Sequence, residues 1–344
     1  MAKSKVSHIF GGKKSYRLGA ALQGGGSYGS FTKGVLKALL ENDIEFSSLS
    51  GTSAGAVNSA LLGYGLNSGG PKRAIEVLDE FWNDIRSNGQ TAKRLMGVFN
   101  PLSFAKSSYP NLSTSFQIMA SLVPKGFVLN ALTDTLKKHI KDWKTLQNGP
   151  VKVFVNATRV DPQTGERSEA VFTGEELNAD TVSASGAVEE LGAKTIDGVD
   201  YFDGAYWRNP RIEDLEKEDI TDLLVVTIQK KPKDGIKAEH QDSLRAKHDK
   251  PGHEILGEEI HSHIEHIREN SPDVNLHVIS MDVADEWDDS SRMNTDPRWL
   301  DELEAMGYEA GQKWVAEHAA KLGKSSSYIG PDAPVTKSQR KLRR

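Results

Sequence analysis

Twice near the start of the chain, a short apolar stretch runs directly into a glycine-rich turn and then into a helical pattern. Residues 17–22 lead into the turn 24–29 and the helix 31–41, and residues 46–50 lead into the turn 51–55 and a second helix. Parallel strands must be joined by long crossover connections, usually helices. This feature therefore predicts an α/β fold built on a mainly parallel sheet.

The rest of the chain continues the alternation. Further strands are expected at residues 151–157, 169–172, 194–196, 201–202, 223–229 and 275–281, and further helices at 71–85, 130–140, 253–269 and 297–322. The pattern predicts a three-layer α/β/α sandwich with a mainly parallel central sheet. We divide the chain into a basic N-terminal tail (1–16), a region with both glycine turns (17–215), a C-terminal α/β continuation of the same domain (216–323) and a basic C-terminal tail (324–344).

Composition excludes several classes of protein. The 344 residues include no cysteine, which rules out disulfides, a cysteine nucleophile and thiolate metal sites. A net charge of -5 does not favour binding to nucleic acid. No run approaches the roughly 18 apolar residues of a transmembrane helix, and the lysines of residues 1–14 precede no apolar core of a signal peptide. We expect a cytoplasmic or peripheral membrane location, and delivery by a specialised secretion system stays open.

The turn 51–55 reads Gly-Thr-Ser-Ala-Gly and has the pattern of a nucleophile elbow between a strand and a helix. Small residues at Gly51 and Gly55 let the neighbouring backbone approach, and the following helix directs its positive end at Ser53. An ordinary tight turn is the alternative interpretation. The strand–turn–helix context favours Ser53 as a nucleophile.

The turn 24–29 exposes several backbone N–H groups and can bind a negative oxygen, either of a phosphate or of a tetrahedral intermediate. No Gly-Lys-Ser/Thr follows it, so it is not a P-loop. The acids Glu41, Asp43 and Glu45 precede the second strand, whereas a dinucleotide site needs an acid after it. The loop fits an oxyanion hole better than a phosphate site.

A serine nucleophile needs a base. None of the ten histidines lies in a glycine-rich or strand-end context. Asp203 does, in Tyr-Phe-Asp-Gly-Ala directly after an apolar strand end. Taken alone, Asp-Gly is more often a turn.

These three motifs, in this order, resemble the patatin-like phospholipase family over residues 18–210. The resemblance implies a Ser–Asp dyad without histidine, in which Ser53 attacks the acyl carbonyl and Asp203 takes the hydroxyl proton. It implies an oxyanion hole at Gly24, Gly25 and Gly26, with Gly25 and Gly26 as the donors, and motif-shaping roles for Gly29, Gly51, Gly55 and Gly204. Residues 293–296 and the final helix are also similar to bacterial patatin-like proteins.

Three positions depart from the family pattern. Tyr28 stands where an arginine or lysine is common, Gln23 stands where an aspartate is common, and residues 184–189 (Ala-Ser-Gly-Ala-Val-Glu) lack the proline that usually ends this block. These differences concern the shape of the acyl site more than its chemistry.

The implied function is hydrolysis of lipid acyl esters through an acyl-enzyme, as in a phospholipase A, with no cofactor or metal. The expected partner is a lipid or other acyl ester at a membrane surface. Three alternatives stay open: a Ser-His-Asp hydrolase whose base is one of the histidines His240, His248, His253 and His277, a nucleotide-binding protein, and a lipid-binding scaffold without turnover.

Three further patterns have competing interpretations. The proline-containing segment 96–123 is rich in apolar residues and is either irregular core or a cover over the acyl site. A metal site is one interpretation of the three histidines His261, His263 and His266, but on a helix their side chains point in different directions. The acidic run 282–289 lacks calcium-loop spacing. A structural role is favoured for both of these polar segments.

Overall fold

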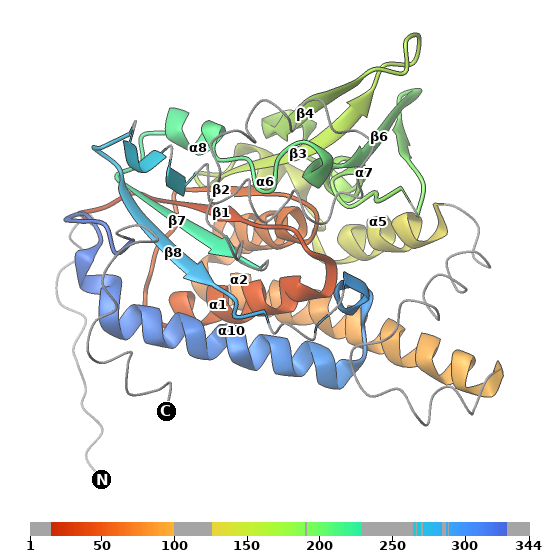
Figure 1. The fold of residues 1–344 in the computed structure, drawn as a ribbon, viewed down its shortest axis with the longest axis horizontal. Helices are drawn as coiled ribbons and strands as arrows, with labels where there is room; N and C mark the ends of the chain where they lie inside the picture. Colours follow the sequence, from red (N-terminus) through yellow and green to blue (C-terminus); the bar gives the residue numbers. More distant parts are fainter. Residues whose placement is uncertain are drawn as a thin grey trace.

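The computed structural model describes residues 15–99, 126–189, 191–228, 264–265, 267–269, 271–283, 287 and 289–328. One eight-stranded sheet organises them (Figure 1). Its strands are β1 (Leu18–Leu22), β2 (Ser48–Gly51), β3 (Lys152–Val160), β4 (Arg167–Thr173), β5 (Lys194–Ile196), β6 (Val199–Asp203), β7 (Asp222–Thr227) and β8 (Asn275–Ser280).

The strand order is β5-β6-β3-β2-β1-β7-β8, and β4 pairs with β3 off this path. The strands β3, β2, β1, β7 and β8 are parallel, whereas β4, β5 and β6 add antiparallel pairs at one end. The predicted mainly parallel sheet is therefore confirmed, with an antiparallel end that the strand pattern alone did not predict.

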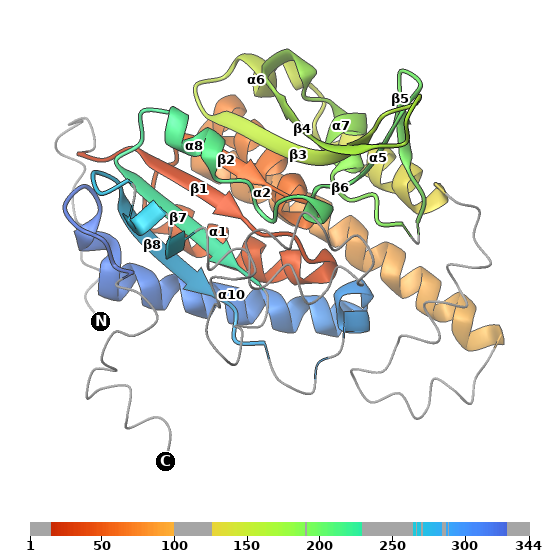
Figure 2. The ribbon, with the colours of Figure 1, turned by 45° about the horizontal axis from the view of Figure 1, so that its top comes forward.

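Alternate side chains of the central strands enter two separate cores. Leu22 and Leu224 belong to a large core with α1 (Gly29–Glu41), α2 (Ala54–Phe99) and α10 (Pro297–His318), and Ala21 and Leu223 belong to a smaller one beside α8 (Glu213–Lys217). This follows from the two-residue period of a strand. Figure 2 shows α1, α2 and α10 on one side of the sheet and α8 on the other. The predicted helical layers on both faces are confirmed.

The two helices predicted after Ser53 are nearly continuous within α2. Gly70 separates them with a φ of 75°, and Pro71 begins the second. The second helix continues to Phe99, beyond the end at residue 85 that the sequence predicted. Gly89 costs a helix only about 1 kcal/mol, and no proline intervenes before residue 101. The other helices are α5 (Phe127–His139), α6 (Trp143–Asn148) and α7 (Ala179–Ala184).

Helices from the two ends of the chain pack backbone to backbone. A Cβ on Gly307 of α10 would lie 1.9 Å from the Phe31 carbonyl oxygen, and one on Gly34 of α1 would lie 2.1 Å from the Glu304 carbonyl oxygen. Glycines on both helices thus allow α10 to lie directly against α1. Residues 216–323 contribute β7, β8 and α10 to the same sheet and core that residues 17–215 form. In the part of the chain that the structure describes, no helix combines the length and hydropathy needed to cross a membrane.

Candidate active site

β2 and β6 end against each other along one edge of β3. Residues 154–155 of β3 pair with both β2 and β4, and residues 157–159 pair with both β6 and β4, so β2 and β6 share the edge opposite β4. β2 runs parallel to β3 and ends with Gly51 opposite Val155, whereas β6 runs antiparallel and ends with Asp203 opposite Ala157. The turn that carries Ser53 therefore lies beside Asp203.

Ser53 occupies a turn that only small neighbours permit. Its φ is 54°, a left-handed conformation that is uncommon for a residue other than glycine. Its backbone N–H donates to the Ser185 hydroxyl oxygen at 2.8 Å. A Cβ on Gly24 would lie 2.7 Å from the Ser53 Cβ, and one on Gly55 would lie 2.0 Å from the Leu22 carbonyl oxygen. The two glycine turns are thus packed against each other, and Ser53 remains partly exposed at the start of α2.

Asp203 is only 3% exposed. Burial raises the pKa of Asp203 to about 7, although hydrogen bonds from the Ala205 N–H and the Ser53 hydroxyl act to lower it. The Ala205 N–H lies 2.8 Å from the carboxylate. On the backbone of Asp203, the N–H donates to the Ala187 carbonyl oxygen at 2.9 Å and the carbonyl accepts from the Thr158 hydroxyl at 2.8 Å. The carboxylate is therefore held in place and can accept a proton near neutral pH.

The glycine loop has one occupied and two available N–H groups. The Gly24 N–H donates to the Asn209 side-chain oxygen at 2.6 Å. Within the described residues, the N–H groups of Gly25 and Gly26 make no hydrogen bond, and both residues are partly exposed. The Gly24 N–H is thus occupied by Asn209, whereas the N–H groups of Gly25 and Gly26 are available for the oxyanion role that the resemblance implies.

Residues near the C-terminal end hold this loop from outside. The Ser27 hydroxyl donates to the Ser291 carbonyl oxygen at 2.9 Å, and the Tyr28 hydroxyl lies 2.5 Å from the Ser291 hydroxyl. A Cβ on Gly26, whose φ is 58°, would lie 2.2 Å from the Arg292 carbonyl oxygen. Tyr28, at a position where the family commonly has a basic residue, thus joins Ser27 in linking the loop to the segment around Ser291.

The other two departures also have structural partners. Gln23 is buried; its side-chain oxygen accepts from the Ile228 N–H at 2.8 Å and its side-chain NH₂ donates to the Asn209 carbonyl at 3.2 Å. An aspartate could not donate the second bond. Glu189, at the position of the missing proline, forms an ion pair with Arg167 at 2.6 Å.

Asn156, which the sequence did not predict as a site residue, joins the turn that carries Ser53 to the loop that follows Asp203. Its side-chain oxygen lies 2.5 Å from the Thr52 hydroxyl, and its NH₂ donates to the carbonyl oxygens of Gly204 at 3.2 Å and Arg208 at 3.0 Å. Asn156 is 2% exposed in the middle of β3. An amide inside the otherwise apolar run 153–157 (Val-Phe-Val-Asn-Ala) was the available signal.

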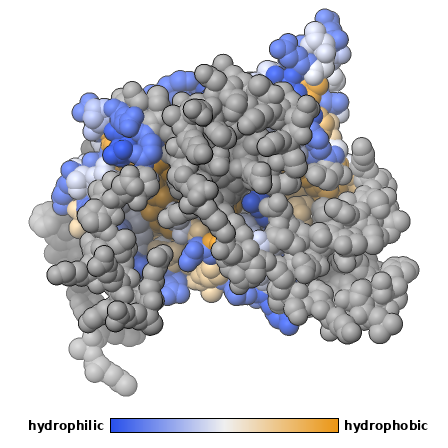
Figure 3. All heavy atoms as spheres, viewed as in Figure 1, coloured by the Kyte–Doolittle hydropathy of each residue, from blue (hydrophilic) through white to orange (hydrophobic). Residues whose placement is uncertain are grey.

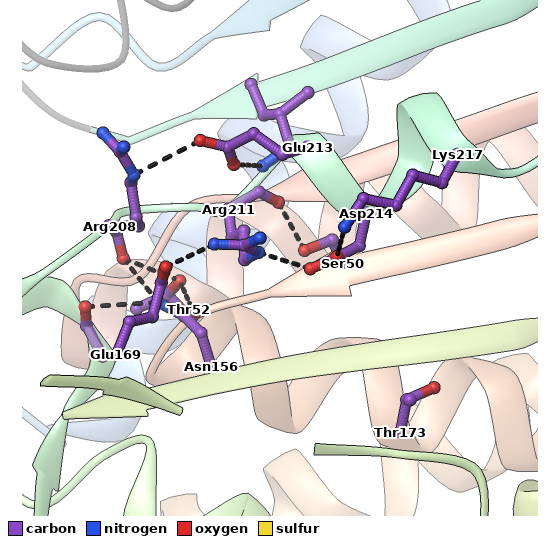
Figure 4. A network of polar contacts seen from close by, with 12 residues as sticks. Ser50, Thr52, Asn156, Glu169, Thr173, Arg208, Arg211, Glu213, Asp214 and Lys217 are labelled. Atoms are coloured by element: carbon purple, nitrogen blue, oxygen red, sulfur yellow. Dashed lines mark hydrogen bonds and ion pairs between the residues drawn. The ribbon is translucent and has the colours of Figure 1, made fainter. Parts of the chain in front are cut away.

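A second polar network continues behind Asn156 (Figure 4). Arg211 binds Glu169 of β4 and Asp214 of α8, and its carbonyl oxygen accepts from the Ser50 hydroxyl at 2.5 Å. The strand that precedes Ser53 and the loop that follows Asp203 are therefore tied together at two successive points, by Asn156 and by Arg211.

His277 is not the base of a histidine-dependent hydrolase. It is fully buried, its Nε2 lies 2.9 Å from Asp222, and its Nδ1 lies 2.9 Å from the Ser327 hydroxyl. Asp222 pairs with Leu18 at the amino ends of the strands, whereas Ser53 follows the carboxyl end of β2. The other three candidate bases, at positions 240, 248 and 253, lie outside the described residues.

Metal ligands are not gathered at this site. In the described ranges, no three histidine, aspartate or glutamate side chains converge in a way that would hold a metal ion. His261, His263 and His266 lie outside those ranges, as do residues 284–286 and 288 of the acidic run and residues 100–125, most of the apolar segment 96–123.

Comparisons with known proteins were made at the level of sequence and of structure. No curated protein matches the sequence. The fold is similar to VipD from Legionella pneumophila (TM-score 0.41, 14% identity, 89% of this chain and 67% of that chain). It is similar to full-length ExoU from Pseudomonas aeruginosa (0.38, 15%, 90% and 53%) and to the human GIVD cytosolic phospholipase A2 (0.39, 10%, 62% and 43%). The chain thus spans about half the length of the last two proteins.

A family model described as patatin-like phospholipase matches residues 20–215, more than half of the chain. The match includes the glycine loop, the Ser53 turn and Asp203, the three motifs on which the resemblance was based. The chain belongs to the patatin-like phospholipase family, and this membership implies a lipid acyl hydrolase.

Proposed function

We propose that this protein hydrolyses lipid acyl esters with Ser53 as nucleophile and Asp203 as its only protein base. The observation that carries the proposal is the position of the Ser53 turn beside a buried carboxylate, that of Asp203, whose pKa is raised to about 7. A base of that pKa is well matched to proton transfer near neutral pH. A strained serine turn that leaves Ser53 partly exposed beside this base is the arrangement that nucleophilic catalysis needs.

In the first half-reaction, the Ser53 hydroxyl oxygen bonds to the ester carbonyl carbon as its proton passes to Asp203. The carbonyl oxygen becomes an oxyanion, and the N–H groups of Gly25 and Gly26 and the N-terminal end of α2 stabilise it. When the tetrahedral intermediate collapses, the carbon–oxygen bond to the alcohol breaks and Asp203 returns the proton to the leaving alkoxide. The acyl group remains on Ser53.

In the second half-reaction, a water molecule takes the place of the alcohol. Asp203 accepts a proton from the water as its oxygen bonds to the acyl carbon. Collapse releases the fatty acid, and Asp203 returns the proton to the Ser53 oxygen. The cycle is balanced with one ester and one water consumed and needs neither histidine nor metal.

Labelling with a fluorophosphonate probe tests the nucleophile. We expect the wild-type protein to be labelled on the peptide that contains Ser53, and Ser53→Ala to lose both labelling and ester hydrolysis. Ser68→Ala is the matched control, because Ser68 lies on α2, the helix that follows Ser53. Its hydroxyl donates to the Gly65 carbonyl oxygen of that helix at 3.3 Å. Labelling that survives in Ser53→Ala would contradict the assignment. If the probe does not label the wild-type protein and calorimetry shows that it binds ATP or NAD, a nucleotide-binding function would be favoured instead.

A further inference from the structure

We propose that Gly186 and Leu132 form the acyl-binding side of the site, and that the size of residue 186 decides which acyl groups Ser53 can accept. The inference rests on the proposed chemistry of Ser53. It goes beyond that chemistry because it names the direction in which the hydrocarbon chain leaves the nucleophile.

Gly186 differs from the other glycines around the nucleophile. Five of those would place a Cβ within 2.5 Å of a backbone oxygen, so the fold itself excludes a side chain there: Gly24, Gly26, Gly51, Gly55 and Gly204. A Cβ on Gly25 would meet the Ile228 side chain at 3.0 Å, and one on Gly29 would meet the Ala54 Cβ at 2.8 Å. A Cβ on Gly186 would meet nothing closer than 3.7 Å, and its φ lies outside the left-handed region. The fold does not need a glycine at position 186.

The space that Gly186 leaves free lies beside the reacting atom. A Cβ at this position would be 3.9 Å from the Ser53 hydroxyl oxygen and 3.8 Å from Cδ2 of Leu132. Ser53, Gly186 and Leu132 are all partly exposed, in contrast to the buried Asp203. The Ser53 hydroxyl oxygen, position 186 and the Leu132 side chain therefore border the same space.

The segment around Gly186 is fixed at both ends. Ser185 accepts a hydrogen bond from the Ser53 N–H at 2.8 Å, and the Ala187 carbonyl accepts one from the Asp203 N–H at 2.9 Å. A side chain added at position 186 therefore cannot move away from the nucleophile by a shift of the backbone. Its volume is subtracted directly from the space for substrate.

The surroundings of this space are apolar on the α5 side. Leu129, Ala187 and Leu191 form a buried cluster with Val188 and Met293 packed against it. Val128, 41% exposed, lies four residues before Leu132 on α5 and hence on the same helix face. Apolar side chains therefore extend from Ser53 past Leu132 to the protein surface, which suits a hydrocarbon chain better than a polar head group.

Kinetics on a series of p-nitrophenyl esters from acetate to palmitate would test this inference. For Gly186→Ala, kcat/KM should fall about 10-fold more for palmitate than for acetate, since one methyl group in an apolar site changes specificity by that order. Gly186→Val should increase this ratio further. Leu132→Ala, which enlarges the same space, should shift preference toward bulkier acyl groups.

Leu136→Ala is the matched control. Leu136 lies one turn further along α5 and is fully buried, so its replacement should lower the melting temperature without changing the chain-length preference. Circular dichroism and thermal melting establish that each variant is folded. If Gly186→Val does not fold, Gly186→Ala and Leu132→Ala still test the inference, because they should change the palmitate-to-acetate ratio of kcat/KM in opposite directions.

An unchanged palmitate-to-acetate ratio in folded Gly186→Ala and Leu132→Ala would overturn the inference. That result is distinct from failure of the proposed function, which would appear in the wild type as absence of fluorophosphonate labelling at Ser53. Labelling at Ser53 with unchanged ratios would retain the nucleophile and place the acyl chain elsewhere.

Discussion

Two buried aspartates sit at opposite ends of the same sheet and have opposite proton affinities. Asp203 ends β6 beside the nucleophile, whereas Asp222 begins β7 at the amino ends of the strands. Burial would raise the pKa of Asp222, but hydrogen bonds with His277, Thr221 and the Gly323 N–H outweigh it and lower the pKa. At Asp203, burial outweighs two hydrogen bonds and raises the pKa to about 7.

The two carboxylates also differ in the hydrogen bonds that they accept. Both oxygens of Asp222 accept from the Gly323 N–H at 3.0 Å, and Thr221 and His277 add bonds of 2.7 and 2.9 Å. These bonds join β7 to β8 and to the segment after α10. Asp203 has fewer donors, and one of them is the hydroxyl that it is proposed to deprotonate.

The largest effect is expected for Asp203→Asn. The amide cannot accept the proton, so kcat should fall by about 10²–10⁴. Thermal stability should not fall, because the change removes a buried carboxylate that has few donors. Measurement of kcat and the melting temperature on the same preparation checks both statements. Nearly normal turnover would mean that another group is the base.

Asp222→Ala should give the converse result. It leaves the His277 ring and the Gly323 N–H without their buried partner, and we expect a loss of about 3 kcal/mol in the free energy of unfolding. The kcat of the folded fraction should be unchanged. Urea denaturation followed by active-site titration separates these quantities. A loss of kcat in fully folded Asp222→Ala would show that the two ends of the sheet are coupled.

The pH dependence of kcat/KM should follow Asp203 alone. Because the base must be unprotonated, kcat/KM should rise about tenfold per pH unit below 7 and level off above it. A profile measured from pH 5 to 9 on a soluble ester would reveal this. A plateau that extends below pH 5 would contradict the raised pKa.

Stability should depend on pH in opposite ways at the two aspartates. The folded-state pKa of Asp203 is raised, so its contribution is complete below the unfolded value of about 4 and is lost as pH rises through about 7. That of Asp222 is lowered, so its contribution is present above about 4 and is lost as pH falls through the lower folded-state value. The free energy of unfolding of Asp203→Asn, relative to that of the wild type, should accordingly be larger at pH 8 than at pH 5.

The smallest effect is expected for Ser185→Ala. The Ser53 N–H would lose its acceptor, which should lower kcat about 10-fold and the free energy of unfolding by about 1 kcal/mol. Because the hydroxyl acts on the backbone of the turn, KM should change little. A change confined to KM would show that Ser185 contacts substrate instead of positioning Ser53.

The sequence was sufficient for the parts of the molecule that local patterns determine. The strand–glycine–helix units predicted the parallel sheet, and the glycine motifs together with Asp203-Gly204-Ala205 indicated the family. Asn156, Asn209 and Ser185 were not predicted as parts of the site. Each acts on a residue more than a hundred positions away, as when Asn209 receives the Gly24 N–H, and no local period records such a contact.

The antiparallel end of the sheet was missed for a related reason. The direction of β4, β5 and β6 depends on the strand that each one pairs with and not on its own residues. The helix predicted at residues 71–85 was too short, since a single glycine at position 89 weakens a helix without ending it.

The meeting of β2 and β6 along β3 has a consequence for how this sequence can change length. The strands that lead to Ser53 and Asp203 approach from opposite directions, so the spacing between these two residues is set by the residues of β3 from Val155 to Ala157. One residue gained or lost there would turn one partner to the wrong face of the sheet. The hydrophilic hairpin tip at residues 161–166, which projects from the body in Figures 1 and 3, lies beyond that count. Insertions should be tolerated at this tip but not within β3. A peptide inserted at the tip should therefore leave the relative position of Ser53 and Asp203 unchanged.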